Sequence, residues 1–371
     1  MNHCIAVVQY RPLEELPPVM TLLTVLKRIG QATHYIGIES TAGKAFLEKT
    51  GIEYSWIPYN NYRKANKLSR FLGFIPRRHW LLRKFSELSK RYSVVTPWYQ
   101  ECHSAALAGD GASKFGRAIT TFFEYECNYG EKWFGFNLEK MLHTNTIVEC
   151  EKNRALLTQK NHNLSVTPFV LPNKAEIDDT AIPALNDEAK EVFEKIGKRP
   201  VFLYQGYVAG DRKDLPYILE TLAKYRPNYC VLSLPGSDYL NKLLAPYPNA
   251  FTLKRIPAPG HLAVTAKASV GIAVYNAEGN DNWAINARNC APNKIYEYAA
   301  FGVPTLGNKI PGLESTIGAA HAGILSDMTA DAILAAADDL VANLKTYSEN
   351  ARQFYISCDL DKIVSQIIEN S

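Results

Sequence analysis

The chain has 371 residues, of which 47% are hydrophobic and 21% are charged, and its formal net charge is +4. This length is too great for one hydrophobic core and predicts two domains of ordinary size. Because the sequence has neither a bilayer-length apolar run nor a signal sequence, it excludes a membrane-spanning protein and favours a cytoplasmic one. The seven cysteines include no Cys-x-x-Cys pair, so neither a disulfide framework nor a zinc site is expected.

Short β-rich apolar runs alternate with helical patterns along the first half of the chain, which is typical of doubly wound α/β domains. We expect helices at 19–29 and 42–50, and strands at 4–8, 33–38, 53–57, 94–97, 118–123, 146–149 and 166–171. A polar segment, 173–186, then reads as an interdomain linker. The first Rossmann-like domain is therefore expected over residues 1–172.

The same alternation restarts after the linker. A helix is expected at 215–225, and strands are expected at 200–205, 230–234, 250–253, 269–274 and 303–306. These elements predict a second doubly wound domain over residues 173–346, followed by a mainly helical segment over 347–371. Within that segment, Asp359-Leu-Asp361 is better explained by helix capping than by metal binding.

A short helix between Pro292 and Gly302 carries the clearest chemistry. Proline suits the first turn of a helix, and glycine marks its end. Lys294, Glu297 and Tyr298 fall at i, i+3 and i+4, which places an ammonium, a carboxylate and a phenol on one face. The helix start and the ammonium would hold an anion, and the carboxylate could accept from two neighbouring hydroxyls. This pattern predicts a site for a nucleotide diphosphate.

The motif Pro-Asn-Lys-x-x-Glu-Tyr-x-x-x-Gly-x-Pro, which begins at Pro292, resembles the donor-binding helix of GT-B nucleotide-sugar glycosyltransferases. It looks closest to the bacterial group-1, family-four-like enzymes that build surface polysaccharides. The resemblance implies two Rossmann-like domains that face each other across a cleft, with the C-terminal helix crossing back to the first domain. It also implies that Glu297 holds the ribose of the donor and that Asn293, Lys294 and Tyr298 line the donor site.

A second donor element follows the strand at 200–205. Gly206 leaves this strand and would let the backbone approach a ligand closely. Arg212 and Lys213 could neutralise phosphate near the start of the next helix, and Arg212 is favoured because family members carry a basic residue at about this distance. The arginine that commonly follows the glycine directly is replaced by Tyr207. The alternative is that both cations are solvated turn residues.

An asparagine-rich loop is expected over 275–291, and a loop of this length is more often functional than accidental. Amide side chains can donate to and accept from sugar hydroxyls. Asn276 ranks first because it follows a strand end, on the crevice side of an open α/β sheet. Asn289 stands where retaining members of the family carry the first glutamate of Glu-x7-Glu, so retention or inversion at the anomeric carbon stays open.

An inverting transfer would need a general base, which is expected from the first domain. It would also need a positively charged group beside the leaving diphosphate, and no metal is expected in this fold class. The candidates for the base are His103, Glu124 and Glu126. For each of these three residues, the alternative is that its side chain is structural or simply solvated.

Residues 62–92 contain ten lysines or arginines against the single acid Glu87, which gives this segment a net charge of +9. Apolar residues recur among the cations at helical spacing. The pattern predicts reversible binding to an anionic membrane surface. A surface for an acidic glycan or nucleic acid and a core-packing helix with solvated charges are the alternatives. Nucleic acid is disfavoured because no nucleic-acid motif accompanies the patch.

Together these features predict a metal-independent glycosyltransferase that moves a sugar from a nucleotide diphosphate, expected to be a UDP-sugar, to a glycan or lipid-linked acceptor. It is expected at the inner membrane face, in the synthesis of surface polysaccharide. A nucleotide-sugar epimerase of the same fold is one alternative. A non-catalytic partner subunit is the other, because the first carboxylate of Glu-x7-Glu is missing.

Overall fold

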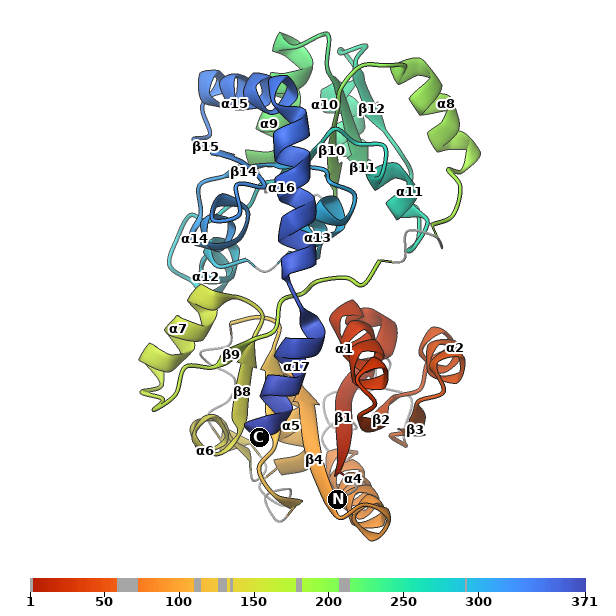
Figure 1. Cartoon of the computed structure of the whole chain (residues 1–371), viewed down its shortest axis with the longest axis vertical. Helices are drawn as coiled ribbons and strands as arrows, with labels where there is room; N and C mark the ends of the chain where they lie inside the picture. Colours follow the sequence, from red (N-terminus) through yellow and green to blue (C-terminus); the bar gives the residue numbers. More distant parts are fainter. Residues whose placement is uncertain are drawn as a thin grey trace. The chain divides into compact units, whose positions relative to one another are not determined.

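The computed structural model describes residues 3–58, 73–109, 115–125, 132–133, 136–177, 182–206, 214–290 and 292–371. The chain divides into two compact units, Met1–Pro172 with Asp359–Ser371, and Asn173–Cys358 (Figure 1). Each unit has its own parallel sheet with connecting helices, as the alternating sequence pattern predicts. Within the described ranges, no helix combines the length and the apolar character needed to cross a bilayer.

The first unit is built on seven parallel strands in the order β3-β2-β1-β4-β5-β8-β9, with a separate β6-β7 hairpin. Its strands are β1 (His3–Pro12), β2 (Ala32–Ile38), β3 (Glu53–Trp56), β4 (Val94–Gln100), β5 (Ile119–Phe122), β6 (Lys132–Trp133), β7 (Phe136–Asn137), β8 (Thr146–Glu149) and β9 (Phe169–Val170). Its helices are α1 (Pro17–Arg28), α2 (Thr41–Thr50), α4 (Phe74–Arg91), α5 (Glu101–Ala108), α6 (Leu138–Thr144), α7 (Lys152–Asn161) and α17 (Leu360–Glu369).

Local sequence accounts for several of these elements. The central strand β1 is buried on both faces, which is why it reads as an unbroken apolar run instead of an alternating one. Ser40 caps the start of α2, and Gly51 ends it in the left-handed conformation with φ of 66°. The strand order reverses between β1 and β4, where Gln9 is the register partner of Gln100. Open α/β sheets bind ligands at such a reversal.

The second unit has six parallel strands in the order β12-β11-β10-β13-β14-β15, so its order reverses between β10 and β13. Its strands are β10 (Val201–Gln205), β11 (Cys230–Leu234), β12 (Ala250–Thr252), β13 (Val270–Ala273), β14 (Thr305–Asn308) and β15 (Gly323–Ser326). Its helices are α8 (Asp187–Ile196), α9 (Asp214–Tyr225), α10 (Asp238–Leu244), α11 (His261–Thr265), α12 (Asn282–Arg288), α13 (Asn293–Ala300), α14 (Pro311–Leu313), α15 (Ala330–Ala342) and α16 (Leu344–Ser357).

The C-terminal segment belongs to both units. Helix α16 packs in the second unit, where Phe354 stacks on Tyr296 of α13 with ring centroids 5.0 Å apart. Helix α17 belongs to the first unit, where Asp361 pairs with Arg28 of α1. The segment that we expected to return as a whole from residue 347 therefore divides after Cys358. Asp359 caps α17 by accepting from the backbone N–H of Lys362 at 3.0 Å, as the capping interpretation predicts.

Candidate functional site

The carboxyl ends of β10 and β13 meet the start of α13 at the strand-order reversal of the second unit. Gln205, the last residue of β10, hydrogen-bonds to Glu297 of α13. After β13, Tyr275 is fixed by the Asn308 amide, which accepts from its N–H at 3.2 Å and donates to its carbonyl at 2.8 Å. The short helix predicted between Pro292 and Gly302 is thus present, and it begins at the expected edge of the sheet.

The Glu297 carboxylate is held in a small polar network. Its Oε2 accepts from the Gln205 amide and lies 3.5 Å from Nε2 of His261 in α11. The Gln205 amide oxygen in turn accepts from the Thr265 hydroxyl at 2.7 Å. The side chains of Glu297 and His261 keep 16% and 20% of their surface exposed. A ligand hydroxyl can therefore reach the carboxylate, as its predicted role requires.

Lys294 lies one turn before Glu297, among aromatic rings. Its ammonium is 4.3 Å from the ring centroid of Tyr204 and 5.5 Å from that of Tyr275, within the range of cation–π attraction. Gly206, at φ of 144°, makes room for it, because a Cβ there would lie 3.0 Å from the ammonium nitrogen. The glycine and the lysine that the sequence assigned separately to phosphate binding therefore lie side by side.

Tyr298 has a different role from the predicted donor contact. Its side chain is fully buried, and its hydroxyl donates to the Leu203 carbonyl at 3.1 Å and accepts from the Gln205 N–H at 3.2 Å. Burial raises the pKa of this phenol well above its usual value. The ring fills the space beside Gly271, where a Cβ would clash with it at 2.2 Å. Tyr298 ties α13 to the sheet and cannot contact a ligand, contrary to our expectation.

The expected loop over 275–291 is in part wrong, because residues within it form the helix α12. Asp281 caps the start of this helix, a signal that the sequence contained. Asn289, expected at the donor, ends the helix instead: it is 6% exposed, and its amide donates to the Ile285 carbonyl at 3.0 Å. Its side chain is thus committed to helix capping.

The remaining predicted donor residues are placed less decisively. Asn276 is half-buried just after β13, and its amide oxygen accepts from the Glu278 N–H at 3.1 Å. Asn293 is half-buried as the first residue of α13. Arg212 and Lys213 lie outside the described residues. The donor prediction in the described chain therefore rests mainly on Lys294 and Glu297, which are both half-buried.

Two of the three candidate bases can be placed in the first unit. His103 is half-buried in the first turn of α5, and burial together with the charge of Arg11 lowers its pKa, which favours the neutral imidazole that a base requires. Glu124 follows β5; its carboxylate is 63% exposed and lies 3.5 Å from the Arg154 guanidinium. Glu126 lies outside the described residues.

Sequence reasoning missed Glu101 and Gln100 at the strand-order reversal of the first unit. Glu101 begins α5 with φ of 65°, a conformation that non-glycine residues adopt rarely, and its carboxylate is 3.0 Å from the Arg11 guanidinium. Gln100 is 1% exposed, and its amide has no hydrogen-bond partner in the described chain. The sequence did contain a signal for these two residues, because both are polar and directly follow an apolar run of strand length.

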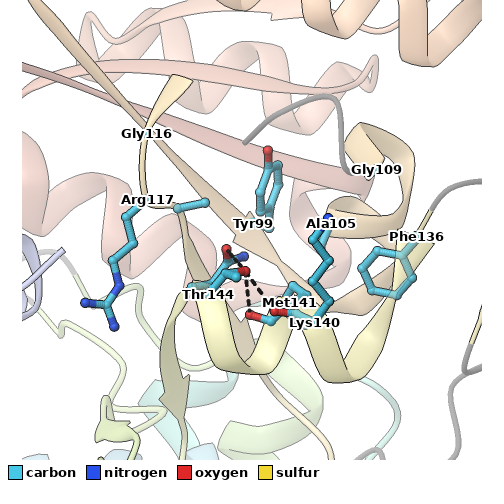
Figure 2. A pocket seen from close by; sticks show the side chains of 11 residues that line it. Tyr99, Ala105, Gly109, Gly116, Arg117, Phe136, Lys140, Met141 and Thr144 are labelled. Carbon is cyan, nitrogen blue, oxygen red and sulfur yellow. Dashed lines mark hydrogen bonds between the residues drawn. The ribbon is translucent and has the colours of Figure 1, made fainter. Parts of the chain in front are cut away.

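A separate cavity of about 260 Å³ lies between α5 and α6, over one face of the first sheet. Figure 2 shows the side chains of Tyr99, Phe136 and Lys140 gathered around it, while Arg117 extends from its edge. Residues just before β5, among them Ala118, also line it, so the cavity is near the amino end of that strand. Neither His103 nor Glu124 is among the residues that line it.

The basic segment 62–92 is described from residue 73 onward, and its first part, 62–72, lies outside the described residues. Arg77 is 4% exposed and donates to the Tyr10 hydroxyl inside the first unit. Arg78 donates to two carbonyl oxygens near the end of α5, at 2.8 and 3.0 Å. Both were expected to face an anionic membrane. They are instead structural, so the prediction is wrong for these two residues.

The rest of α4 follows the core-packing alternative. Leu81 and Phe85 are fully buried on its apolar face. Two cations elsewhere on this helix pair with Glu87: Lys84 at 2.6 Å and Arg83, which stays 71% exposed, at 3.7 Å. The hydrophobic stripe that suggested an interfacial helix is therefore used within the protein.

Solved structures resemble the chain over its whole length. A glycosyltransferase from Rickettsia africae aligns with 100% of this chain and 97% of its own, with a TM-score of 0.70 and 14% identity. Anabaena HepE, solved in complex with UDP-glucose, aligns with 99% of this chain and 98% of its own, with a TM-score of 0.65 and 12% identity. UDP-GlcNAc 2-epimerase from Neisseria meningitidis, bound to UDP-GlcNAc, aligns over 100% of both chains, with a TM-score of 0.63 and 13% identity.

Neither protein-family models nor the sequences of curated proteins match the chain. Identities of 10–14% with the solved structures establish the fold and leave the reaction open. The predicted fold class is confirmed: the chain has the GT-B fold of two doubly wound α/β domains, which nucleotide-sugar glycosyltransferases and epimerases share.

Proposed function

We propose that the chain is a glycosyltransferase that transfers a sugar from a nucleotide diphosphate donor, in particular a UDP-sugar, to a glycan or lipid-linked acceptor in surface polysaccharide synthesis. One observation carries the proposal. The Glu297 carboxylate and the Lys294 ammonium lie one turn apart at the strand-order reversal of the second unit, each beside the end of β10. At this spacing the carboxylate can accept hydrogen bonds from the ribose hydroxyls of a nucleoside diphosphate, and the ammonium can neutralise its phosphates.

The proposed chemistry follows from these groups. Glu297 binds the ribose hydroxyls, and Lys294 stabilises the negative charge that develops on the leaving diphosphate. That role requires no resident metal. Among the described candidates we favour His103 to accept the proton of an acceptor hydroxyl, since its lowered pKa favours the unprotonated imidazole near neutral pH. Glu124 and Glu126 are the alternatives for this role.

An epimerase is the second candidate, because one observation favours it. An epimerase needs additional carboxylates, and Glu101, at the strand-order reversal of the first unit, is a carboxylate that sequence reasoning missed. The Neisseria structure shows that a UDP-GlcNAc 2-epimerase shares this fold. The two functions differ in one requirement, since epimerisation proceeds without an acceptor.

Thermal unfolding with UDP, GDP, ADP and CMP tests the nucleotide class first. A ligand at a hundred times its dissociation constant adds about 2.7 kcal/mol to stability, which moves the transition by a few degrees. We expect the shift with UDP. The purified protein is then incubated with UDP-sugars with and without a glycan acceptor. Conversion that needs the acceptor supports transfer; conversion without it supports epimerisation; and no shift with any nucleotide would contradict both.

A further inference from the structure

Among the described residues, the groups that contact Glu297 use one of its two carboxylate oxygens. Oε2 accepts from the Gln205 amide and faces His261, whereas Oε1 makes no hydrogen bond within the part of the chain that the structure describes. The side chain retains 16% of its surface, and Oε1 is not among the buried side-chain oxygens that lack a partner in the described residues, so this oxygen is open to a ligand. The carboxylate is therefore divided into a fixed oxygen and a ligand-facing oxygen.

The amide that holds Oε2 is itself oriented. The Thr265 hydroxyl lies 2.7 Å from the Gln205 amide oxygen and 3.2 Å from the His261 carbonyl oxygen. Donation of its single proton along the shorter contact leaves the Gln205 NH₂ group to face Glu297. The backbone N–H of Gln205 is bound by the Tyr298 hydroxyl at 3.2 Å. Gln205 and Thr265 are 6% and 0% exposed, so water does not compete for these bonds. The side chain is thus fixed through both its backbone and its amide.

We infer that Gln205 is a positioning residue, which holds Glu297 so that Oε1 faces the hydroxyls of the donor nucleoside. A glutamate on a helix surface otherwise samples several rotamers, and fixing it before the ligand arrives removes that entropic cost from binding. The orientation runs from Thr265 through Gln205 to Glu297. This inference rests on the proposed nucleotide site and adds the element that makes it selective for a nucleoside bearing ribose hydroxyls.

Gln205→Glu tests the contact without any ligand, because the two side chains have nearly the same shape. Two carboxylates at hydrogen-bond distance share a proton, so the pKa of the pair is raised in the folded state. A raised folded pKa leaves stability intact at low pH and removes it as pH rises. We expect the variant to melt close to wild type near pH 5 and progressively below it toward about pH 8. Parallel melting curves across this range would overturn the inference.

The positioning role is tested with UDP by calorimetry, as the ratio of variant to wild-type dissociation constants at each pH. Taking the ratio cancels the titration of the ligand's own phosphate. We expect the ratio for Gln205→Glu to be at least about tenfold near pH 8 and to shrink on acidification, when the shared proton restores a donor to Glu297. A residue with a merely structural role would give a ratio that does not vary with pH, and that result would overturn the inference.

Thr265 supplies the matched pair of variants. Thr265→Ser keeps the hydroxyl that orients the amide, whereas Thr265→Val removes it at similar volume. We expect Thr265→Val to weaken UDP binding and to reduce the preference for UDP over 2′-deoxy-UDP, with Thr265→Ser close to wild type. Equal effects of the two would contradict the relay. If wild type itself binds no nucleotide, the proposed function fails, whereas wild-type binding with unaffected Gln205 variants defeats only the positioning role.

Discussion

Replacing Glu297 separates the ligand role of this side chain from its structural one. Glu297→Gln keeps an oxygen that can accept from the Gln205 amide, but it removes the negative charge. A hydrogen bond to a charged group contributes about 1.5–3 kcal/mol, against about 0.5–1.5 kcal/mol for a neutral one. Since each 1.4 kcal/mol is tenfold in affinity, we expect Glu297→Gln to weaken UDP binding several-fold to about tenfold while the melting temperature stays near that of wild type.

Glu297→Ala should have a larger and mixed effect. It removes the acceptor of the Gln205 amide, which is 6% exposed, and an unsatisfied buried donor costs about 1–3 kcal/mol. We therefore expect the melting temperature to fall by a few degrees and UDP binding to weaken further than in Glu297→Gln. The alanine variant alone could not distinguish a lost ligand contact from a damaged site.

Titration calorimetry with UDP and thermal unfolding measure the two effects on the same preparations. Glu349→Gln is the matched control, because it makes the same change in the same unit. The Glu349 side chain is 68% exposed, and its ion pair with Lys345 is long, at 4.0 Å. Such a surface pair contributes little to stability. If Glu297→Gln binds UDP as tightly as Glu349→Gln does, the ribose assignment is refuted.

Three further results are expected. Lys294→Ala should weaken UDP binding much more than uridine binding, because the ammonium acts on phosphate; equal losses would refute that role. The pKa of His103 is lowered in the folded state, so stability is lost as pH falls below about 6.5. His103→Gln should therefore reduce this acid sensitivity and lower turnover with donor affinity intact. Because the apolar face of α4 packs in the core, only its exposed cations remain to attract an anionic membrane. Any binding to anionic liposomes, measured by flotation, should therefore decrease with salt and weaken in an Arg83→Glu, Lys90→Glu variant; equal partitioning would exclude α4 as the contact.

The sequence predicted the helix between Pro292 and Gly302 because the evidence for it is local. The spacing of Lys294 and Glu297 needs only the helical period, and the structure places both side chains at the strand ends. Gln205 could not be found in this way, since it meets Glu297 across 92 residues of sequence. Thr265 and His261, which complete the network around Glu297, belong to a third element, the short helix α11. Contacts between elements depend on tertiary packing, which the sequence pattern of one element does not contain.

Two errors arose where the local pattern was read incompletely. Tyr298 shares a face with Lys294 at i+4, but it also continues the buried stripe of Ile295 and Ala299, and the structure follows the stripe. Arg77 likewise precedes the buried Leu81 by one helical turn, so its position already placed it on the apolar face of α4. A count of charges along a segment cannot reveal this, because it ignores the direction in which each side chain points.

The two strand-order reversals differ in how their glutamines are satisfied. Gln205 ends β10 with both ends of its amide bonded, so the carboxylate it holds is oriented before any ligand binds. Gln100 ends β4 equally buried, but its amide has no partner among the described residues. A buried amide without partners costs about 1–3 kcal/mol, and that cost is recovered when a polar partner arrives. The carboxylate in the second unit is thus oriented in advance, whereas the first unit retains unused hydrogen-bonding capacity beside Glu101 among the described residues. A polar partner that bound Gln100 would therefore stabilise the first unit more than the same partner would at the already bonded Gln205.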